Sequence, residues 1–177
     1  MVCYILEDSN IWSERRHTMF RTGDKIVHPM HGAGVVDSIV TKKVNGVTRD
    51  YYILKLPVGG MVVMIPTANC QEIGVRAVMD AASAEAVIAA IPGIQVDMTP
   101  GWNQRYRENM VRLKSGDLIE VATVVKGLSR RDEARGLSTG ERKMLHTARQ
   151  ILLSELVLAQ GSSYEEMERR VNTALAQ

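Results

Sequence analysis

One short segment joins an aromatic side chain to two cations at the expected start of a helix. Trp102 follows the turn residues Pro100 and Gly101, and Arg105 and Arg107 come shortly after it. An exposed Trp there could act as an apolar wedge at a DNA base step, with the arginines holding nearby phosphates. The other interpretation is that Trp102 belongs to the core and staples its helix to a neighbour, because Trp is highly buried on average. The residue types alone favour the core interpretation.

A second group of cations lies around a predicted connection between two later helices. These side chains could approach one DNA backbone, and they are Arg130, Arg131, Arg135, Arg142 and Lys143. Neighbouring acids favour partial pairing instead. We therefore expect Glu141 to cap the following helix, and Arg131 or Arg135 to bind an acid for structural reasons.

Positive charge is concentrated in one part of the chain. The net charge is only +2, but residues 101–149 hold 11 Lys and Arg against 6 Asp and Glu. Residues 150–177 hold 2 basic and 4 acidic residues, so the balance reverses near the C-terminus. A focused basic face suits phosphate binding, although mixed-charge helical surfaces are also common in proteins that bind no nucleic acid.

The residues give no support for catalysis or metal binding. His28 and His31 share a turn, but no nearby carboxylate or Cys completes a ligand set, so we expect them to bond or pack locally. Cys3 and Cys70 have no ligand-like spacing. Neither a nucleophile elbow nor a phosphate-binding glycine loop is present. The sequence predicts a protein that is not an enzyme and has no cofactor and no metal.

The sequence also favours a cytoplasmic protein without a membrane partner. No apolar run approaches the roughly 20 residues that span a bilayer. The first residues lack the basic start and apolar middle of a signal peptide. Residues 1–18 show no clear period, and we treat them as an extension of unknown role.

Residues 19–76 predict a small β-rich domain. Short β-branched runs are separated by Gly, Pro and Asn-Gly turns, and they predict strands at 25–27, 35–43, 48–56 and 61–65. Asn45-Gly46 is a strong hairpin signal between the second and third of these runs. Residues 57–60 form a further predicted turn. Short strands joined by tight turns suggest a strongly bent sheet or an open barrel.

Residues 77–177 predict an all-α domain, so the whole chain is expected to be a two-domain α+β protein. Helices are predicted at 81–91, 102–114, 118–128, from Ser138 to about residue 160, and from residue 162 onward. Ser138–Glu141 and Ser162–Glu165 have the spacing of capping boxes. Residues 92–101 form a linker or a sharp turn, and residues 129–137 form the basic connection described above.

The sequence resembles the CarD/CdnL family of bacterial transcription regulators. Four segments carry the resemblance in the same order: FRTGDKIVHPMHGAGVV (20–36), WNQRYREN (102–109), LKSGD (113–117) and RRDEARGLSTGERKMLHTARQILLSELVLA (130–159). The match extends from about Met19 to Ala176, which is nearly the whole chain apart from the extension. Several separate motifs in the right order are far more specific than any one of them.

For residues 19–76 the resemblance implies a Tudor-like or SH3-like domain similar to the polymerase-binding module of transcription-repair coupling factors. It would align a strand edge with the β subunit of RNA polymerase. The expected contact residues are Lys42, Met64, Ile65 and Pro66. Met64 occupies a position that is basic in some members.

For residues 77–177 the resemblance implies a compact helical bundle that contacts promoter DNA, without sequence specificity, at the upstream edge of the transcription bubble. Trp102 matches the family's wedge tryptophan, which reverses the preference for the core interpretation. Basic residues near DNA would include Arg105, Arg107, Arg142 and Lys143. The expected result is a more stable open complex, often at ribosomal RNA promoters, from a monomer associated with the nucleoid.

Two other functions stay open on the sequence alone. The first is a protein-interaction adaptor, whose β-domain binds polymerase while its helices bind a second protein without touching DNA. The second is a sequence-specific repressor, although the sequence shows no helix-turn-helix with base-reading side chains. Charge reversal at Arg105 and Arg107 distinguishes the first alternative, and footprinting without polymerase distinguishes the second.

Overall fold

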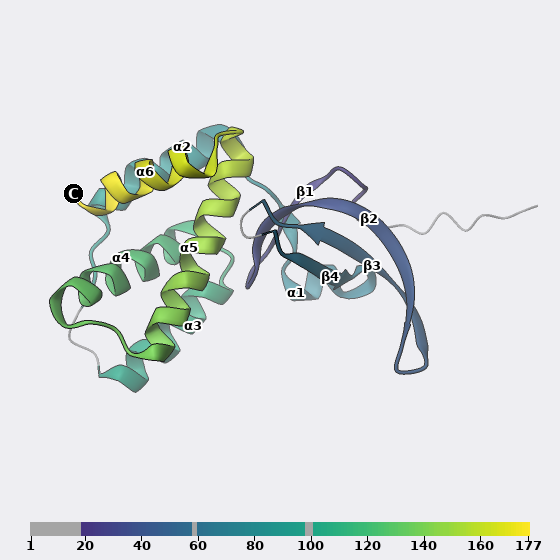
Figure 1. Ribbon diagram of the computed structural model, residues 1–177, viewed down its shortest axis with the longest axis horizontal. Helices are drawn as coiled ribbons and strands as arrows, with labels where there is room; N and C mark the ends of the chain where they lie inside the picture. The colour runs from purple at the N-terminus through teal and green to yellow at the C-terminus, as the bar shows by residue number, and fades with distance from the viewer. Residues whose placement is uncertain (1–18, 58–59, 98–100) are drawn as a thin grey trace, which may run out of the picture.

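The protein consists of a curved sheet and a bundle of helices that lie side by side (Figure 1). The computed structural model describes residues 19–57, 60–97 and 101–177 of the 177-residue chain. The predicted extension at residues 1–18 lies outside the described residues, as do parts of the predicted turn at 57–60 and of the predicted linker at 92–101. The expectation of a two-domain α+β fold is confirmed.

The sheet has five antiparallel strands in the order β4-β3-β2-β1-β5. Their bounds are β1 Lys25–His28, β2 Gly32–Val44, β3 Val47–Lys55, β4 Val62–Pro66 and β5 Arg76–Ala77. Strands β2 and β3 form a long curved hairpin (Figure 1). Its turn is Asn45-Gly46, where both residues have positive φ, as the predicted Asn-Gly hairpin requires. A register shift between Val36 and Ser38 adds to the bend.

The sheet encloses a small core of its own. A 3₁₀ turn, η1 Thr67–Asn69, and a short helix, α1 Cys70–Ile73, lead from β4 back to β5. The buried residues are Ile26, Val36, Tyr52, Leu54, Leu56, Ile65, Cys70 and Val75. The sequence did not predict α1 or β5, because each is too short to show a hydrophobic period.

Five longer helices form the second core. Their bounds are α2 Ala81–Ala90, α3 Trp102–Lys114, α4 Leu118–Arg135, α5 Thr139–Gln160 and α6 Tyr164–Leu175, with a 3₁₀ turn, η2 Ile91–Gly93, after α2. Leu, Val, Ile and Ala side chains of α4 and α5 make up most of this core. The helices bury their apolar side chains against one another, and residues 151–157 of α5 are buried on every side of the helix.

Two predicted helix ends were wrong. Helix α4 continues to Arg135 rather than ending at Leu128, because residues 129–135 are mostly good helix formers and Gly136, with φ 76°, is the first residue suited to end the helix. The last helix is capped by Ser163 rather than Ser162, since the Ser163 hydroxyl accepts from the backbone of Glu166. The capping box at Ser138 is confirmed.

Helix α5 holds the helical half against the sheet. The Ser154 hydroxyl accepts a hydrogen bond of 2.8 Å from the backbone N–H of Ala33. Gly32 has φ 92°, and a Cβ there would meet the same hydroxyl at 2.4 Å, so a side chain at this position would separate the two halves. Lys25 adds a bond from its ammonium to the carbonyl of Leu158.

A buried carboxylate strengthens the same interface. Glu155 on α5 is 0 % exposed, and its two oxygens accept from the Arg76 guanidinium at 2.5 and 2.8 Å. The backbone N–H of Met79 donates to it at 3.2 Å. Arg76 also donates to the carbonyl of Gly116, so one guanidinium connects β5 to two parts of the helical half.

Arg76→Met is expected to lower the free energy of unfolding by about 2–3 kcal/mol. Breaking a buried ion pair typically costs 3–5 kcal/mol, and the lower value follows because the Arg76 side chain is 35 % exposed and partly screened. Chemical denaturation checks the value. The control is Lys55→Met, which removes the exposed Lys55–Asp37 pair and should cost less than about 1 kcal/mol. Equal losses in the two variants would contradict the structural role of Arg76.

The turn that faces α5 contains both histidines of the predicted local pair. The rings of His28 and His31 have centroids 4.5 Å apart, and the Nδ1 atom of His28 accepts from the backbone N–H of Met30 at 3.1 Å. Burial, and then the neighbouring His31, lower the pKa of His28 below its ordinary value of 6.5. The Gln150 side chain donates to the carbonyl of His31, which ties this turn to α5.

Acidification should therefore destabilise this turn. Because the pKa of His28 is lower in the folded chain than in the unfolded one, its contribution is fully present above pH 6.5 and is lost as the pH falls below that value. The free energy of unfolding of His28→Asn, whose amide oxygen can still accept from Met30, should fall less between pH 7 and 5 than that of the wild type. His146→Asn, at an exposed site on α5, is the control. Parallel pH profiles for wild type and His28→Asn would contradict the expectation.

Candidate nucleic-acid interface

Trp102 lies at the exposed start of α3. Its side chain is 47 % exposed, so it does not belong to either core, and the core interpretation is wrong. The indole Nε1 donates to the Ser138 hydroxyl at 3.3 Å, and the ring stacks on Tyr106 with centroids 5.4 Å apart and planes inclined by 26°. The ring is thus held at the surface by a neighbour on each of two helices.

The buried carboxylate of Glu141 organises the base of this surface. Glu141 is 4 % exposed, and its Oε1 accepts from Nη2 and Nε of Arg105 at 2.6 and 3.1 Å. Its Oε2 accepts from the backbone N–H and the hydroxyl of Ser138, in the predicted capping box. Nε of Arg131 lies 3.4 Å from Oε1, too poorly aligned for a hydrogen bond. One carboxylate thus joins the starts of α3 and α5 to the end of α4.

Electrostatics keep Glu141 ionised in this position. Burial alone would raise the pKa of Glu141, but the hydrogen bonds from Arg105 and Ser138 outweigh it and hold the pKa below its usual value. The expectations that Glu141 caps a helix and that Arg131 binds an acid agree with these contacts. Arg105 is also committed to this ion pair, and its side chain is largely buried.

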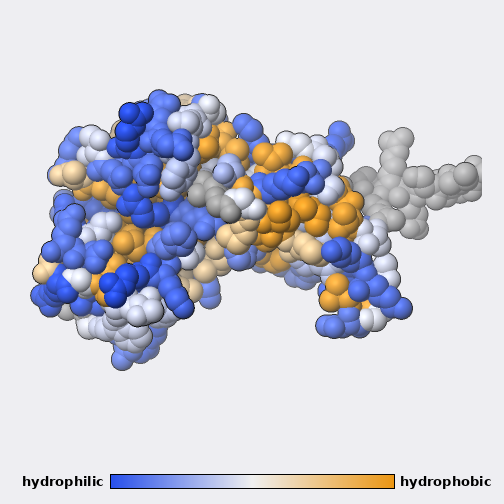
Figure 2. Space-filling model, in the orientation of Figure 1, coloured by the Kyte–Doolittle hydropathy of each residue, from blue (hydrophilic) through white to orange (hydrophobic). Residues whose placement is uncertain are grey.

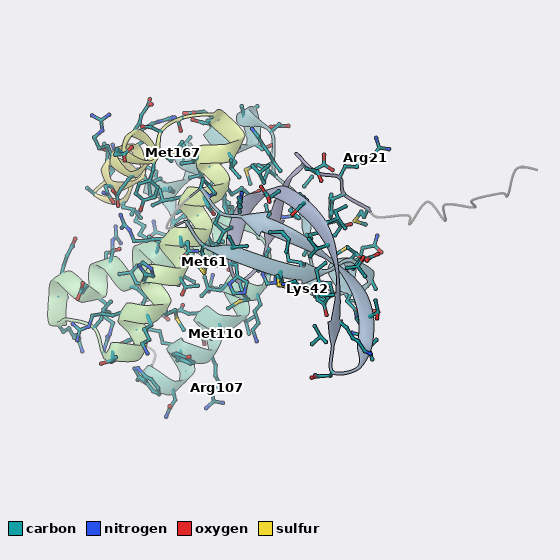
Figure 3. All side chains as sticks on the ribbon, turned by 45° about the vertical axis from the view of Figure 1, so that its right-hand side comes forward. Arg21, Lys42, Met61, Arg107, Met110 and Met167 are labelled. Carbon is teal, nitrogen blue, oxygen red and sulfur yellow. The ribbon has the colours of Figure 1, made fainter. Side chains whose placement is uncertain are left out.

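The remaining basic residues of the predicted DNA surface divide into two groups. Arg142 and Lys143 are exposed in the first turn of α5, next to Glu141, and Arg107 extends outward from α3 (Figure 3). Arg135 is exposed at the end of α4. Arg130, by contrast, lines a separate hollow with side chains of α5 and α6. The structure therefore does not bring Arg130 together with Trp102.

Lys126 is a buried cation that the sequence analysis missed. It is 1 % exposed, and its ammonium donates to the carbonyls of Ile91 and Pro92 at 2.9 and 2.7 Å. Burial, and then the nearby Arg130, lower its pKa. Lys126 thus supplies hydrogen-bond donors to two backbone carbonyls of η2. No local pattern indicates this role, because Lys126 and its acceptors are far apart in the sequence.

Three of the candidate polymerase-binding residues, Met64, Ile65 and Pro66, lie on β4, an edge strand of the sheet, whereas Lys42 lies on β2, beyond β3. The edge carries exposed apolar side chains at Met61, Val62 and Met64, and Figure 2 shows a broad apolar area over this half. The Lys42 ammonium lies 3.8 Å from the sulfur of Met64. Ile65 is 1 % exposed, so its side chain belongs to the core and only its backbone could reach a partner.

Other chemistry finds no site in the described part of the chain. Residues 19–57, 60–97 and 101–177 contain no cluster of three His, Cys, Asp or Glu side chains that could hold a metal. None of the helices in these ranges is long and apolar enough to cross a bilayer.

The comparisons with known proteins identify this two-domain chain as a CarD-like transcription regulator. The chain belongs to the CarD family: residues 20–79 match the family model described as CarD-like/TRCF RID domain, and residues 86–172 match CarD, C-terminal domain. It is 33 % identical over 150 residues to YdeB, a candidate transcription factor of Bacillus subtilis (strain 168). That match covers 85 % of this chain and 98 % of YdeB. The resemblance found in the sequence is confirmed, and the family is generally non-enzymatic.

Proposed function

We propose that this protein binds the β subunit of RNA polymerase through its sheet and stabilises the open promoter complex by presenting Trp102 to the upstream edge of the bubble. The observation that carries the proposal is the exposure of Trp102, a large apolar ring held at the surface by Ser138 and Tyr106. A fixed, exposed ring of this kind can insert at a weakened base step and oppose its re-pairing.

The cations around Trp102 would supply attraction to phosphates that does not depend on sequence. Arg107, Arg142 and Lys143 are exposed and could meet the DNA backbone, and Arg135, exposed at the end of α4, would add a further cation. Arg105 and Arg131, which contact Glu141, would instead position the start of α3. Because few phosphate contacts are available, binding to free DNA should be weak, and because those contacts are ionic, it should weaken further as the salt concentration rises.

The contact with RNA polymerase would form by addition of a strand of the polymerase to the edge strand β4. An unpaired edge offers backbone N–H and C=O groups to a strand of the partner, and exposed side chains of alternate residues add specificity. Here Val62 and Met64, with the partly exposed Pro66 on the same face, would contact the partner directly, Lys42 would add a charge, and Ile65 would contribute backbone only. The protein would act as a monomer, associated with the nucleoid in the bacterial cytoplasm. Ribosomal RNA promoters are the first promoters at which the effect on the open complex should be measured.

The experiment that tests this function measures open-complex lifetime with cognate polymerase at a ribosomal promoter, after adding a DNA competitor. The protein should lengthen the lifetime, and reversing the charges of Arg107, Arg142 and Lys143 to Glu should remove the effect. Binding to polymerase should persist in that variant. A lifetime that is unchanged by the wild-type protein, despite confirmed polymerase binding, would favour the adaptor that makes no DNA contact.

A further inference from the structure

An apolar groove continues from the wedge surface towards the sheet. Trp102, Tyr106 and Met110 lie at intervals of four residues, so they share one face of α3. Beside Tyr106 and Met110 a groove of about 190 Å³ opens between α3 and α5 and ends at the turn of the sheet half. Its lining comprises Met30, Tyr106, Met110, Leu113, Gly140, Lys143, Met144 and Thr147.

The groove combines apolar walls with a single kind of charge. Three methionines and a tyrosine supply polarizable surface, which packs well against flat rings. Lys143 is exposed at the groove, and none of the described lining residues is a carboxylate. The groove is smaller than the roughly 300–1,000 Å³ of small-molecule pockets, which favours an extended occupant that only partly enters it.

We infer that this groove receives unpaired nucleotides of the DNA strand released at the fork, so that bases pack along Tyr106 and Met110 towards Met30 while Lys143 meets a phosphate. The inference rests on the proposed function, because Trp102 would deliver the strand. Two observations favour single-stranded DNA. The groove is continuous with the wedge surface through the stacked Trp102 and Tyr106 rings, and it places one aromatic ring beside a cation, the combination with which proteins bind single strands without sequence preference.

The end of the groove that lies at the sheet half is held rigidly by the fold. Met30 belongs to the turn that is tied to α5 by the bond from Gln150 to the carbonyl of His31. The close approach of Gly32 to Ser154 fixes the next residues of that turn. The far wall of the groove is therefore held in place by the interface between the two halves of the protein.

The test uses the full-length protein and fluorescently labelled fork DNA, with binding measured by anisotropy at low salt. Three probes share one duplex and carry an unpaired tail of either one nucleotide, four nucleotides, or one nucleotide followed by three abasic residues; both tail polarities are examined. Extending the tail from one to four nucleotides should raise affinity about tenfold, the effect of one well-stacked base. The abasic tail, which adds only phosphates, should give a much smaller gain.

Two variants fill the groove from opposite ends without opening a core. Thr147→Leu reduces the space far from Trp102, and Gly140→Leu adds a side chain at a position where a Cβ would meet only Trp102, at 4.0 Å. Both should abolish the gain from the longer tail, and Thr147→Leu, which lies away from Trp102, should keep the affinity for the one-nucleotide fork. Val111→Ala, at a 71 % exposed site of α3 outside the groove, should keep both.

The possible outcomes distinguish the inferred binding of single-stranded DNA in the groove from the proposed wedge function of Trp102. No gain from the longer tail, an equal gain from the abasic tail, or a gain that survives both filling variants would overturn the inference. If the preference for a fork over a blunt duplex then still depends on Trp102, the proposed function stands without the groove. If the wild-type protein shows no preference for a fork, the wedge function itself is contradicted.

Discussion

Trp102→Ala should shorten the lifetime of the open complex in the presence of the protein by about tenfold or more. Unstacking a base step costs a few kcal/mol, and the inserted Trp102 ring would offset part of this cost. Each 1.4 kcal/mol of lost stabilisation changes the lifetime of the open complex about tenfold. The affinity for polymerase should not change, because the edge strand β4 lies in the other half of the protein. The measurement is dissociation of a competitor-challenged complex at saturating protein.

Two substitutions accompany this experiment. Trp102→Phe keeps an aromatic ring but loses the bond to Ser138, so it should retain part of the effect. Val111→Ala removes an exposed apolar side chain from the same helix and should change nothing. A Trp102→Ala protein that extends the lifetime as well as the wild type does would contradict the wedge.

Glu141→Ala should destabilise the helical half by about 3–5 kcal/mol, the cost of leaving a buried cation without its partner. The Arg105 side chain is only 11 % exposed, so water cannot replace the carboxylate fully. The substitution also removes half of the capping box at the start of α5. Denaturant unfolding measures the loss.

The matched control is Glu120→Ala. Glu120 pairs with Arg112, but both side chains are 39 % exposed, so the loss should stay below about 1 kcal/mol. Glu141→Gln keeps an acceptor for Ser138, so its loss of unfolding free energy should lie between those of Glu141→Ala and Glu120→Ala. A Glu141→Ala protein as stable as Glu120→Ala would show that the Arg105–Glu141 pair does not hold α3 to α5.

The elements that a local pattern specifies were predicted well. The Asn45-Gly46 hairpin and the capping box at Ser138 each depend on residues close in sequence, and the structure has both. The end of α4 was predicted too early, because the charged run after Leu128 resembles a loop in composition but has a high helix propensity.

The site was predictable by residue type but not by environment. Trp102 was identified from its position after a turn, yet its exposure depends on how α3 meets α5, which no local spacing encodes. Arg105 and Arg130 looked alike in sequence, but one contacts Glu141 and the other faces a different hollow. The burial of Ile65 follows from alternation along β4, which places every second side chain in the sheet's core.

The most direct test of the wedge asks where α3 lies on the promoter. A benzophenone-bearing side chain in place of Asn103, which is exposed beside Trp102, is irradiated in the open complex and the crosslinked nucleotides are mapped. The same side chain in place of Thr173, exposed on α6 away from the start of α3 (Figure 1), is the control. Crosslinks from position 103 confined to the upstream edge of the bubble, with none from position 173, are the expected result. Crosslinks from position 103 to protein alone would contradict the wedge and support the adaptor.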